Sequence, residues 1–326
     1  MGRNVVSVIA VLVLGMMVAA PAGAEKLGLI TGGEKGTYYQ FGLNLKELAR
    51  SEGVDLLVYN SNGSINNVYA VYKAPMTQMG IVQSDVLAFV HRVQSDRTLK
   101  KIARKIKMVF PLYNEEVHLL GRSGLSDFDD LEGKRVAIGK EGSGTYLTAK
   151  LLLEVSGVRP ARQVTMGTDQ ALAALKGGEI DAMFYVAGYP VKLFAENVAR
   201  ADGLRVVPIR NKSILEFYPG ARIPTGTYGF QNEPVDTVAV KAVLVSFDFR
   251  RNNCEYVGRF AKMVADNMAW LRENGHPKWL SVDIDYPLKG WGQYDCVKKY
   301  LGKSAARRKR KSGEINPLME AIKDMF

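Results

Sequence analysis

Short apolar segments alternate with amphipathic ones along most of the chain, and this alternation constrains the fold more than any other feature. The segments 27–30, 56–59 and 79–82 have the length and apolar character of buried strands, and helical patterns over 38–50 and 64–73 separate them. The same order restarts after residue 113. Strands that alternate with helices are typical of layered α/β folds, so we predict an α/β protein.

The alternating pattern divides into two units. Residues 25–115 form the first lobe together with 215–326, because the apolar, β-branched segment 238–249 leads back toward them and a helix expected over 254–272 covers it. Residues 116–214 form the second lobe. Two chain crossings then leave a cleft between the lobes, where small ligands commonly bind. We expect the ligand site in this cleft.

The N-terminus has the composition of a secretory signal peptide. Arg3 supplies a positive charge, residues 5–20 are apolar, and Ala22-Gly23-Ala24 is a cleavage site of small residues. We therefore expect residues 1–24 to be removed during export; an uncleaved anchor helix is the alternative. No later segment approaches the ~20 apolar residues that a membrane-spanning helix needs.

Two cysteines, Cys254 and Cys296, are the only ones in the chain. In an oxidising compartment two such thiols usually form one disulfide. A metal or redox pair is the alternative, but these sites use closer spacing. We predict a structural disulfide that ties a C-terminal helix to the segment after it.

The net charge of +11 is concentrated near the C-terminus. If Arg3 and the six basic residues of the run 303–311 are left out, 37 of the 44 Lys and Arg residues remain. Against 33 Asp and Glu residues this leaves a net charge of only +4. We expect this basic run to be solvated, with weak contact to anionic lipid as the second interpretation. Nucleic acid is not an expected partner. The segment 316–325 after it has the pattern of a short helix.

Two glycine-rich loops, 31–39 and 139–146, each lie between a predicted strand and a predicted helix. Glycine lets the backbone approach a ligand closely, and a helix start offers unpaired N–H groups to a carboxylate or phosphate. Thr37, Ser143 and Thr145 add hydroxyl groups. Taken alone, either loop is better explained as an ordinary tight turn with a Ser or Thr cap. Their occurrence in both lobes favours an anion site.

Polar and aromatic residues at other strand ends are further candidates for this site. Ser64 begins the helix 64–73 as its expected N-cap, and Gln83 and Ser84 end the third strand. Tyr113 and Tyr185 lie near the predicted hinge, where aromatic rings suit the walls of a small cavity. Each residue also has an ordinary structural explanation as a cap, a turn residue or a core residue.

No catalytic constellation is evident. The loops match neither G-x-G-x-x-G nor the phosphate-binding G-x-x-x-x-G-K-[ST] pattern. His91, His118 and His276 occur in unrelated contexts, and we expect each on the surface or as a helix cap. The adjacent pair Glu115 and Glu116 has the appearance of a solvated turn. We expect no catalytic residues, no metal and no cofactor.

Several of these motifs occur together in one known family. Thr31-Gly-Gly-x-x-Gly-Thr-Tyr-Tyr, Gly63-Ser-x-x-Asn67, Ile81-Val-Gln-Ser-Asp85, Gly142-Ser-Gly-Thr145 and the segment 181–190 resemble the TAXI subgroup of TRAP-transporter solute receptors. The resemblance covers about residues 27–190. It implies a periplasmic receptor of the two-lobe type II binding-protein fold, which binds a small carboxylate (amino acid, dicarboxylate or 2-oxo acid) and feeds a permease with two membrane subunits.

The resemblance also implies ligand-binding positions. Carried over by position they are Gly36, Thr37, Tyr38, Ser64, Gln83, Ser143, Gly144, Thr145, Tyr185 and Gly188. The charged residues Glu34 and Lys35 in the first loop depart from the family pattern, and we expect them to affect ligand choice.

Three classes of function follow from these observations. The first is a binding protein that closes on an anion and docks on a permease. The second is a periplasmic sensor that reports its bound ligand to a membrane receptor. The third is a secreted hydrolase with Ser143 as nucleophile, which needs a base that the sequence does not display.

Overall fold

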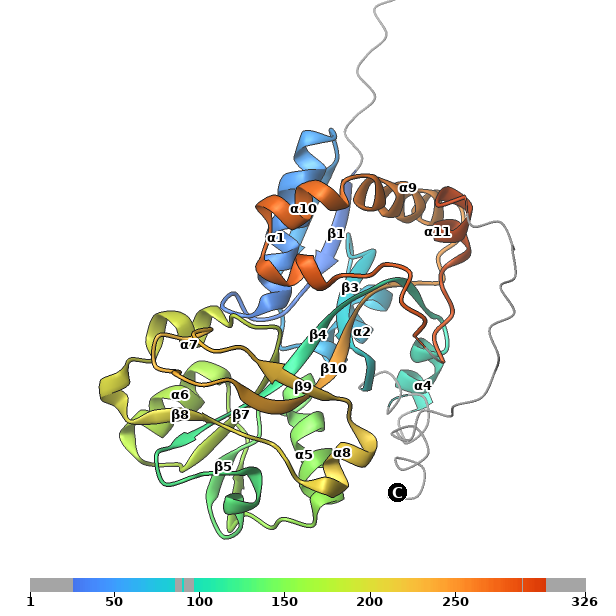
Figure 1. Ribbon diagram of the computed structural model, residues 1–326. Coiled ribbons are helices and arrows are strands. Elements are labelled where there is room, and N and C mark those ends of the chain that lie inside the picture. Colours follow the sequence, from blue (N-terminus) through green and yellow to red (C-terminus); the bar gives the residue numbers. More distant parts are fainter. Residues whose placement is uncertain (1–25, 86–89, 91–96, 289, 303–326) are drawn as a thin grey trace, which may run out of the picture.

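The computed structural model describes residues 26–85, 90, 97–288 and 290–302 (Figure 1). The expected signal peptide 1–24, the basic run 303–311, the predicted helix 316–325 and His91 lie outside the described residues. Within the described part of the chain, no helix is both long and apolar enough to cross a membrane.

One mixed sheet of ten strands runs through the described part of the chain, and eight of them follow the order β2-β1-β3-β10-β4-β7-β5-β6. At one end β1 (Lys26–Ile30) pairs in parallel with β2 (Asp55–Tyr59) and β3 (Met79–Gln83). At the other end β5 (Arg135–Ala137) pairs in parallel with β6 (Arg162–Val164) and β7 (Ala182–Ala187). These two ends define the first lobe and the second lobe, respectively.

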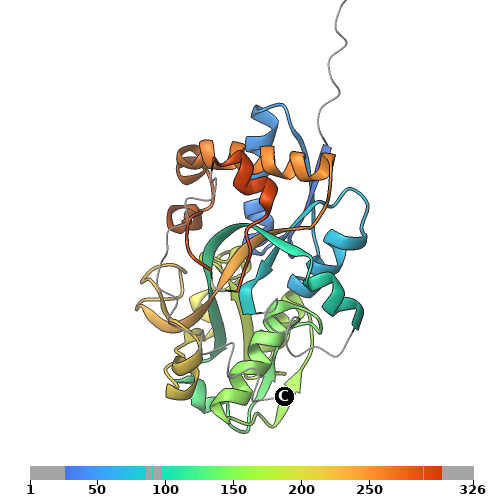
Figure 2. The same ribbon diagram turned by 90° about the vertical axis from the view of Figure 1, so that its right-hand side faces the viewer.

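Two long strands, β4 (Ile106–Arg122) and β10 (Val235–Phe247), connect the lobes. They pair with each other antiparallel, and they join β3 of the first lobe to β7 of the second. The short strands β8 (Leu204–Val207) and β9 (Gly220–Ile223) extend them in the second lobe. Figure 2 shows the lobes one above the other, with strands that pass from one into the other.

Helices cover the sheet in both lobes (Figure 1). In α1 the buried residues Phe41, Leu45 and Leu48 recur every three or four positions, so one face of the helix packs on the sheet. The helices of the first lobe are α1 (Thr37–Ser51), α2 (Ser64–Lys73), α4 (Arg97–Ala103), α9 (Asn252–Asp266), α10 (Met268–Asn274) and α11 (Asp295–Tyr300). Those of the second are α5 (Gly144–Ser156), α6 (Thr168–Gly177), α7 (Lys192–Asn197) and α8 (Lys212–Phe217), and the 3₁₀ helices are η1 (Phe128–Leu131), η2 (Arg200–Asp202) and η3 (Pro277–Ser281).

The packing of residues 215–240 differs from the expected lobe assignment. Tyr218, Tyr228 and Val238 are buried in the cores of the second lobe, whereas the sequence assigned this stretch to the first. The reason is that β10 is one continuous strand. Its start pairs with β9, and its end pairs with β3, so the crossing lies inside the strand and not before it.

Two element predictions also differ from the structure. The strand expected over 117–120 is part of the 17-residue β4, because Asn114, Glu115 and Glu116 interrupt its apolar pattern without ending the strand. The helix expected over 254–272 is two helices, α9 and α10, which meet at Asn267.

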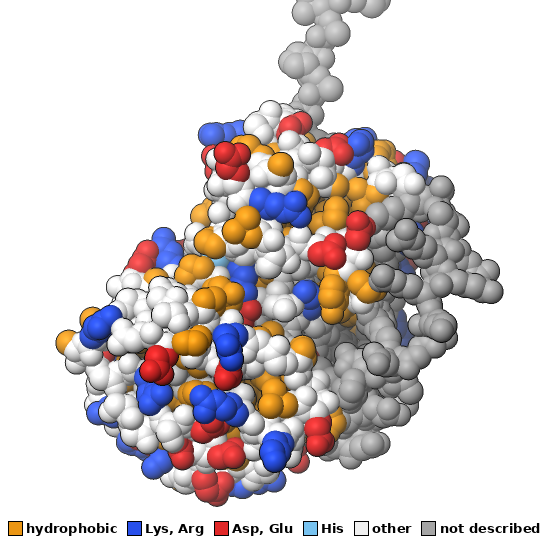
Figure 3. Space-filling model, viewed as in Figure 1, with side chains coloured by type: hydrophobic (Ala, Val, Ile, Leu, Met, Phe, Trp, Pro, Cys, Tyr) orange, Lys and Arg blue, Asp and Glu red, His pale blue; other side chains and the backbone are white. Residues whose placement is uncertain are grey.

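The predicted disulfide between Cys254 and Cys296 is confirmed. It joins α9 to α11, with Cα atoms 5.7 Å apart. On the face shown in Figure 3, acidic and basic side chains are interspersed over the second lobe, as on an ordinary solvated surface.

Candidate ligand-binding site

A cavity of about 590 Å³ lies between the two lobes. This volume is within the range of small-ligand sites. Nine of the twelve predicted site residues line it: Gly36, Thr37, Tyr38, Ser64, Gln83, Ser143, Gly144, Thr145 and Tyr185. The structure therefore brings the two glycine-rich loops together on opposite walls of one cavity.

Four helices begin at the cavity wall. Their N-cap residues are Gly36 before α1, Gly63 before α2, Ser143 before α5 and Gly167 before α6, and all four line the cavity. The three glycine caps have no side chain to occupy the first N–H groups of their helices. Each start also carries the positive end of a helix dipole, so the cavity is suited to an anion. The start of α6 is a part of the site that the sequence did not predict.

Ser64 has a different role from the N-cap that the sequence predicts. The cap is Gly63, whose φ of 121° favours glycine, and Ser64 is the first residue of α2. The Ser64 Oγ accepts a hydrogen bond from the backbone N of Gln83 at 3.1 Å. The hydroxyl thus holds the end of β3 against the start of α2, a tertiary contact that local sequence cannot show.

Asn67 completes the support of this wall. Its Nδ2 donates to the backbone oxygens of Thr31, at 2.5 Å, and Ile81, at 2.7 Å. These bonds tie α2 to the segments around the ends of β1 and β3. The first glycine-rich loop is therefore held by a buried amide behind the cavity.

The two hydroxyl groups of the second loop also have structural partners. The Ser143 Oγ accepts from the backbone N of Tyr146 at 3.1 Å, which confirms the capping interpretation. The Thr145 Oγ1 accepts from the backbone N of Val186 at 3.2 Å. No histidine lines the cavity in the described part of the chain, so Ser143 has no imidazole base there.

Contacts between the lobes close the cavity at its edges. The Thr37 hydroxyl, which is buried, donates to the backbone oxygen of Gly188. At the rim, Nζ of Lys35 lies 2.6 Å from Oδ1 of Asp169. Lys35, one of the two charged residues of the first loop, thus bridges the two lobes instead of facing solvent alone.

Three predicted residues do not line the cavity. The Ser84 Oγ accepts a hydrogen bond from the backbone N of Lys241 at 3.1 Å. This bond attaches β10 to the residue that follows β3. Tyr113 is in the core of the first lobe, with its ring 4.3 Å from that of Phe41. Gly188 lies against Tyr113, and a Cβ there would come within 2.5 Å of that ring. None of the three is among the residues that line the cavity.

Glu115 and Glu116 contradict the prediction of a solvated turn. They are in the middle of β4, with only 1% and 3% of their surface exposed. Successive side chains of a strand point to opposite faces, so the two carboxyl groups diverge. Glu115 lines the cavity and accepts from the Tyr38 hydroxyl at 2.7 Å. Burial raises the pKa of Glu115 well above its usual range, although the Tyr38 hydrogen bond opposes this.

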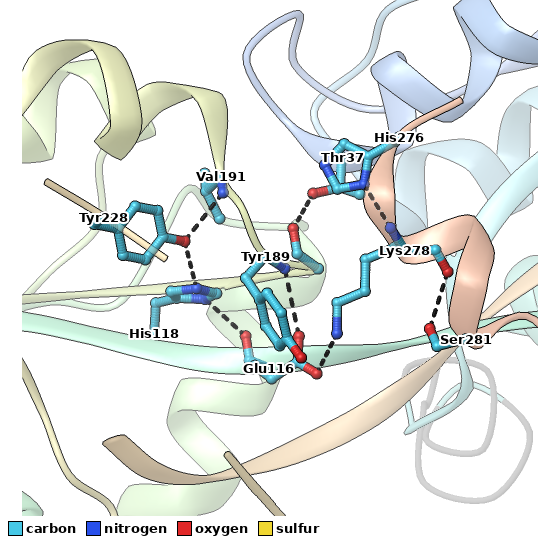
Figure 4. Close-up of polar contacts among 10 residues, drawn as sticks. Thr37, Glu116, His118, Tyr189, Val191, Tyr228, His276, Lys278 and Ser281 are labelled. Carbon is cyan, nitrogen blue, oxygen red and sulfur yellow. Dashed lines mark hydrogen bonds and ion pairs between the residues drawn. The ribbon is translucent and has the colours of Figure 1, made fainter. Parts of the chain in front are cut away.

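Glu116 forms a buried ion pair with Lys278 of η3 (Figure 4). The Lys278 Nζ lies 2.5 Å from Oε1 of Glu116 and 3.7 Å from the ring centre of Tyr189. Burial raises the pKa of Glu116 and lowers that of Lys278, while their mutual attraction acts against both shifts. The pair connects the C-terminal segment to the strand that joins the lobes.

Two histidines have roles in the same region (Figure 4). His118 is fully buried, which contradicts the surface prediction, and its Nε2 lies 2.8 Å from the Tyr228 hydroxyl. Burial lowers the pKa of His118 to about 3. His276 confirms the capping prediction, because its Nδ1 accepts from the backbone N of Lys278 at the start of η3.

Comparison with known proteins places the chain in a family. The model of the NMT1-like family matches residues 29–278. The chain belongs to the NMT1-like family. The match includes every residue named above as lining the cavity, together with Glu116 and Lys278.

Solved structures resemble this NMT1-like chain over most of its length. MatC from Rhodopseudomonas palustris with bound malate is 18% identical, covers 94% of this chain and 99% of its own, and has a TM-score of 0.57. The periplasmic binding protein BugD is 12% identical, with coverages of 93% and 97% and a TM-score of 0.56. A periplasmic transporter is 16% identical, with coverages of 78% and 89% and a TM-score of 0.51. The NMT1-like chain therefore has the two-lobe α/β fold of periplasmic solute-binding proteins, as predicted.

Proposed function

We propose that this NMT1-like protein is the extracytoplasmic receptor of a TRAP transporter of the TAXI subgroup. It binds a small carboxylate between its lobes and delivers it to the membrane permease. The motifs shared with that subgroup and the periplasmic binding-protein fold support this proposal. The signal peptide 1–24, the periplasmic location and the permease subunits as partners belong to the same proposal.

The convergence of four helix starts on one cavity carries the proposal. A carboxylate accepts hydrogen bonds from several backbone N–H groups and is stabilised by the helix dipoles, without a cationic side chain. Thr37 of the first loop lines one wall of the cavity, and Ser143 and Thr145 of the second loop line the opposite wall. Since Ser143 and Thr145 already accept backbone hydrogen bonds, their O–H groups are left to donate.

The proposed cycle is a hinge motion of the two lobes. The strands β4 and β10 are the covalent connections that pass between the lobes in the described chain. Bending at these strands opens the cavity, and a bound anion draws the helix starts of both lobes together. The closed form, with Thr37 and Lys35 in contact with the second lobe, is the form that docks on the permease. Binding and release require no bond chemistry, so we propose that the protein is not an enzyme.

A thermal-shift screen tests this function. The chain 25–326 is unfolded, refolded to remove any ligand carried from the cell, and screened against amino acids, dicarboxylates, 2-oxo acids and inorganic anions. A ligand at about 100 times its Kd adds about 2.7 kcal/mol of stability and raises the melting temperature.

The matched variants are Thr37→Ala and Ser143→Ala, which line the cavity, and Ser156→Ala at the far end of α5. We expect the ligand-induced shift to fall in the first two variants and to persist in the third. No shift with any carboxylate would contradict the proposal.

A further inference from the structure

We propose that Glu115 is the subsite for a positively charged amino group, so that the carboxylate ligand is a zwitterionic amino acid. The ligand carboxylate would lie at the helix starts and its ammonium group at the Glu115 carboxylate. This inference rests on the proposed function, since it assigns the other end of the same ligand.

The position of Glu115 supports this role. It lines the cavity with 1% of its surface exposed, and the Tyr38 hydroxyl donates to its Oε2 at 2.7 Å. No described cationic side chain bonds directly to Glu115. A ligand cation would supply the missing charge partner for a buried carboxylate.

The charges around the cavity are distributed unevenly. Of the residues that line it, three are charged: Glu115, Lys140 and Asp169. Lys140 is exposed and donates to Oδ1 of Asn62 at 3.0 Å, and Asp169 is paired with Lys35 at the rim. Glu115 is therefore the one buried charged side chain among these lining residues. The cavity has positive helix starts and one acidic interior group, which matches the two ends of a zwitterion.

A dicarboxylate or 2-oxo acid fits this interior group less well. Among the described lining residues no arginine is present, and the one lysine is engaged at the rim. A second carboxylate beside Glu115 would face a like charge unless Glu115 kept a proton. An ammonium group has three donors and a positive charge, and both are complementary to a carboxylate.

Proton release distinguishes a ligand with an ammonium group at Glu115 from one with a hydroxyl or carboxylate group there, because of the groups around Glu115. They are Tyr38 of α1, Asp85 after β3, Tyr113 and Glu116 of β4, Tyr185 of β7 and Lys278 of η3. Burial, together with Asp85 and Glu116, favours the protonated form of Glu115 in the empty site, whereas the Tyr38 hydrogen bond and Lys278 oppose it. An ammonium ligand therefore favours release of a proton from Glu115, whereas a hydroxyl or carboxylate group does not.

The test compares ligands that differ only in this group. L-aspartate with L-malate, and L-alanine with L-lactate, exchange an ammonium for a hydroxyl group on one carbon skeleton. Titration calorimetry of the 25–326 chain at pH 7 should show the amino acid as the tighter ligand of a pair. Loss of one partner from a buried charged pair typically weakens binding by about 30-fold or more. Glu115→Gln should cause this loss for the amino acid and change the hydroxy acid by less than about threefold.

Glu141→Gln is the matched control, because Glu141 is an exposed glutamate of the second loop that does not line the cavity. Its affinities should equal those of the unmodified protein. Proton release, measured in buffers of different ionisation enthalpy, should accompany amino acid binding and be absent with the hydroxy acid. This measurement uses the unmodified protein and decides the question even if Glu115→Gln does not fold.

Each negative result has a distinct meaning. The ammonium subsite is overturned if the hydroxy acids bind as tightly as the amino acids, or more tightly, without proton release. It is also overturned if Glu115→Gln weakens both members of a pair equally. Either result leaves the proposed carboxylate receptor intact. If no carboxylate of the wider screen binds, the proposed function fails and the inference fails with it.

Discussion

Gln83 in the first lobe and Gly144 in the second lobe are in direct contact across the cavity. A Cβ atom on residue 144 would lie 1.5 Å from Oε1 of Gln83, and Gln83 has only 2% of its surface exposed. The absence of a side chain at Gly144 therefore allows the start of α5 to approach the end of β3. This close approach is a condition for the closed arrangement of the lobes.

Gly144→Ala should weaken ligand binding by about fivefold or more, since a buried clash of this kind typically costs 1–3 kcal/mol. The added methyl group forces Gln83 to move or holds the lobes apart. Titration calorimetry measures the change in Kd, and small-angle scattering measures the separation of the lobes. Gly124→Ala is the control, because a Cβ there meets no atom within 4 Å. Equal affinities of the two variants would show that the contact does not govern closure.

Thr37→Val tests the buried hydrogen bond between the lobes. Without the hydroxyl, the backbone oxygen of Gly188 loses its partner when the cavity closes. An unsatisfied buried acceptor costs about 1–3 kcal/mol, which corresponds to about a 5- to 150-fold increase in Kd. Thr37→Ser keeps the hydroxyl and should bind nearly as well as the unmodified protein. A Thr37→Val variant that binds as tightly as the unmodified protein would show that this hydrogen bond does not govern closure.

Lys35→Ala should have a much smaller effect. The side chains of Lys35 and Asp169 are 44% and 66% exposed, so solvent and salt screen their attraction. We expect binding to weaken by no more than about fivefold, and the difference to vanish at high salt. Lys262→Ala is the control, because it breaks an exposed ion pair with Asp266 at 2.7 Å within one helix. A change in ligand preference would indicate that Lys35 contacts the ligand.

His118 makes the stability of the protein depend on pH. Its pKa is about 3 in the folded protein because it is buried, compared with 6.5 for an exposed histidine. As the pH falls below 6.5 the unfolded chain binds a proton that the folded chain does not, so unfolding becomes easier. The free energy of unfolding should fall by up to about 1.4 kcal/mol per pH unit from this group.

Denaturant unfolding of the unmodified protein and His118→Gln between pH 7 and pH 4.5 measures this dependence. Other titrating groups are shared, so they cancel in the difference between the two proteins. The unmodified protein should lose more stability than the variant as the pH falls. Parallel pH profiles would show that His118 does not titrate differently in the folded state.

Part of the candidate site was predictable because its chemistry is local. A glycine-rich turn before a helix places N–H groups at the helix start, and Ser143 caps α5 through a residue only three positions away. The role of Ser64 was not predictable in this way. Its hydroxyl bonds to Gln83, 19 residues later in the chain, although its sequence context is that of an N-cap.

The sequence by itself determined the α/β alternation, the two glycine-rich loops and the Cys254–Cys296 pair, because these depend on periodicity, backbone freedom and residue type. The tertiary structure decided which charged groups are buried. Glu115 accepts a hydrogen bond from Tyr38, which is 77 positions away in the sequence, and Glu116 pairs with Lys278, which is 162 positions away. Both glutamates lie in the polar centre of β4, whose sequence resembles a turn. Burial and charge pairing depend on which distant segments the fold brings together, and local sequence does not contain that information.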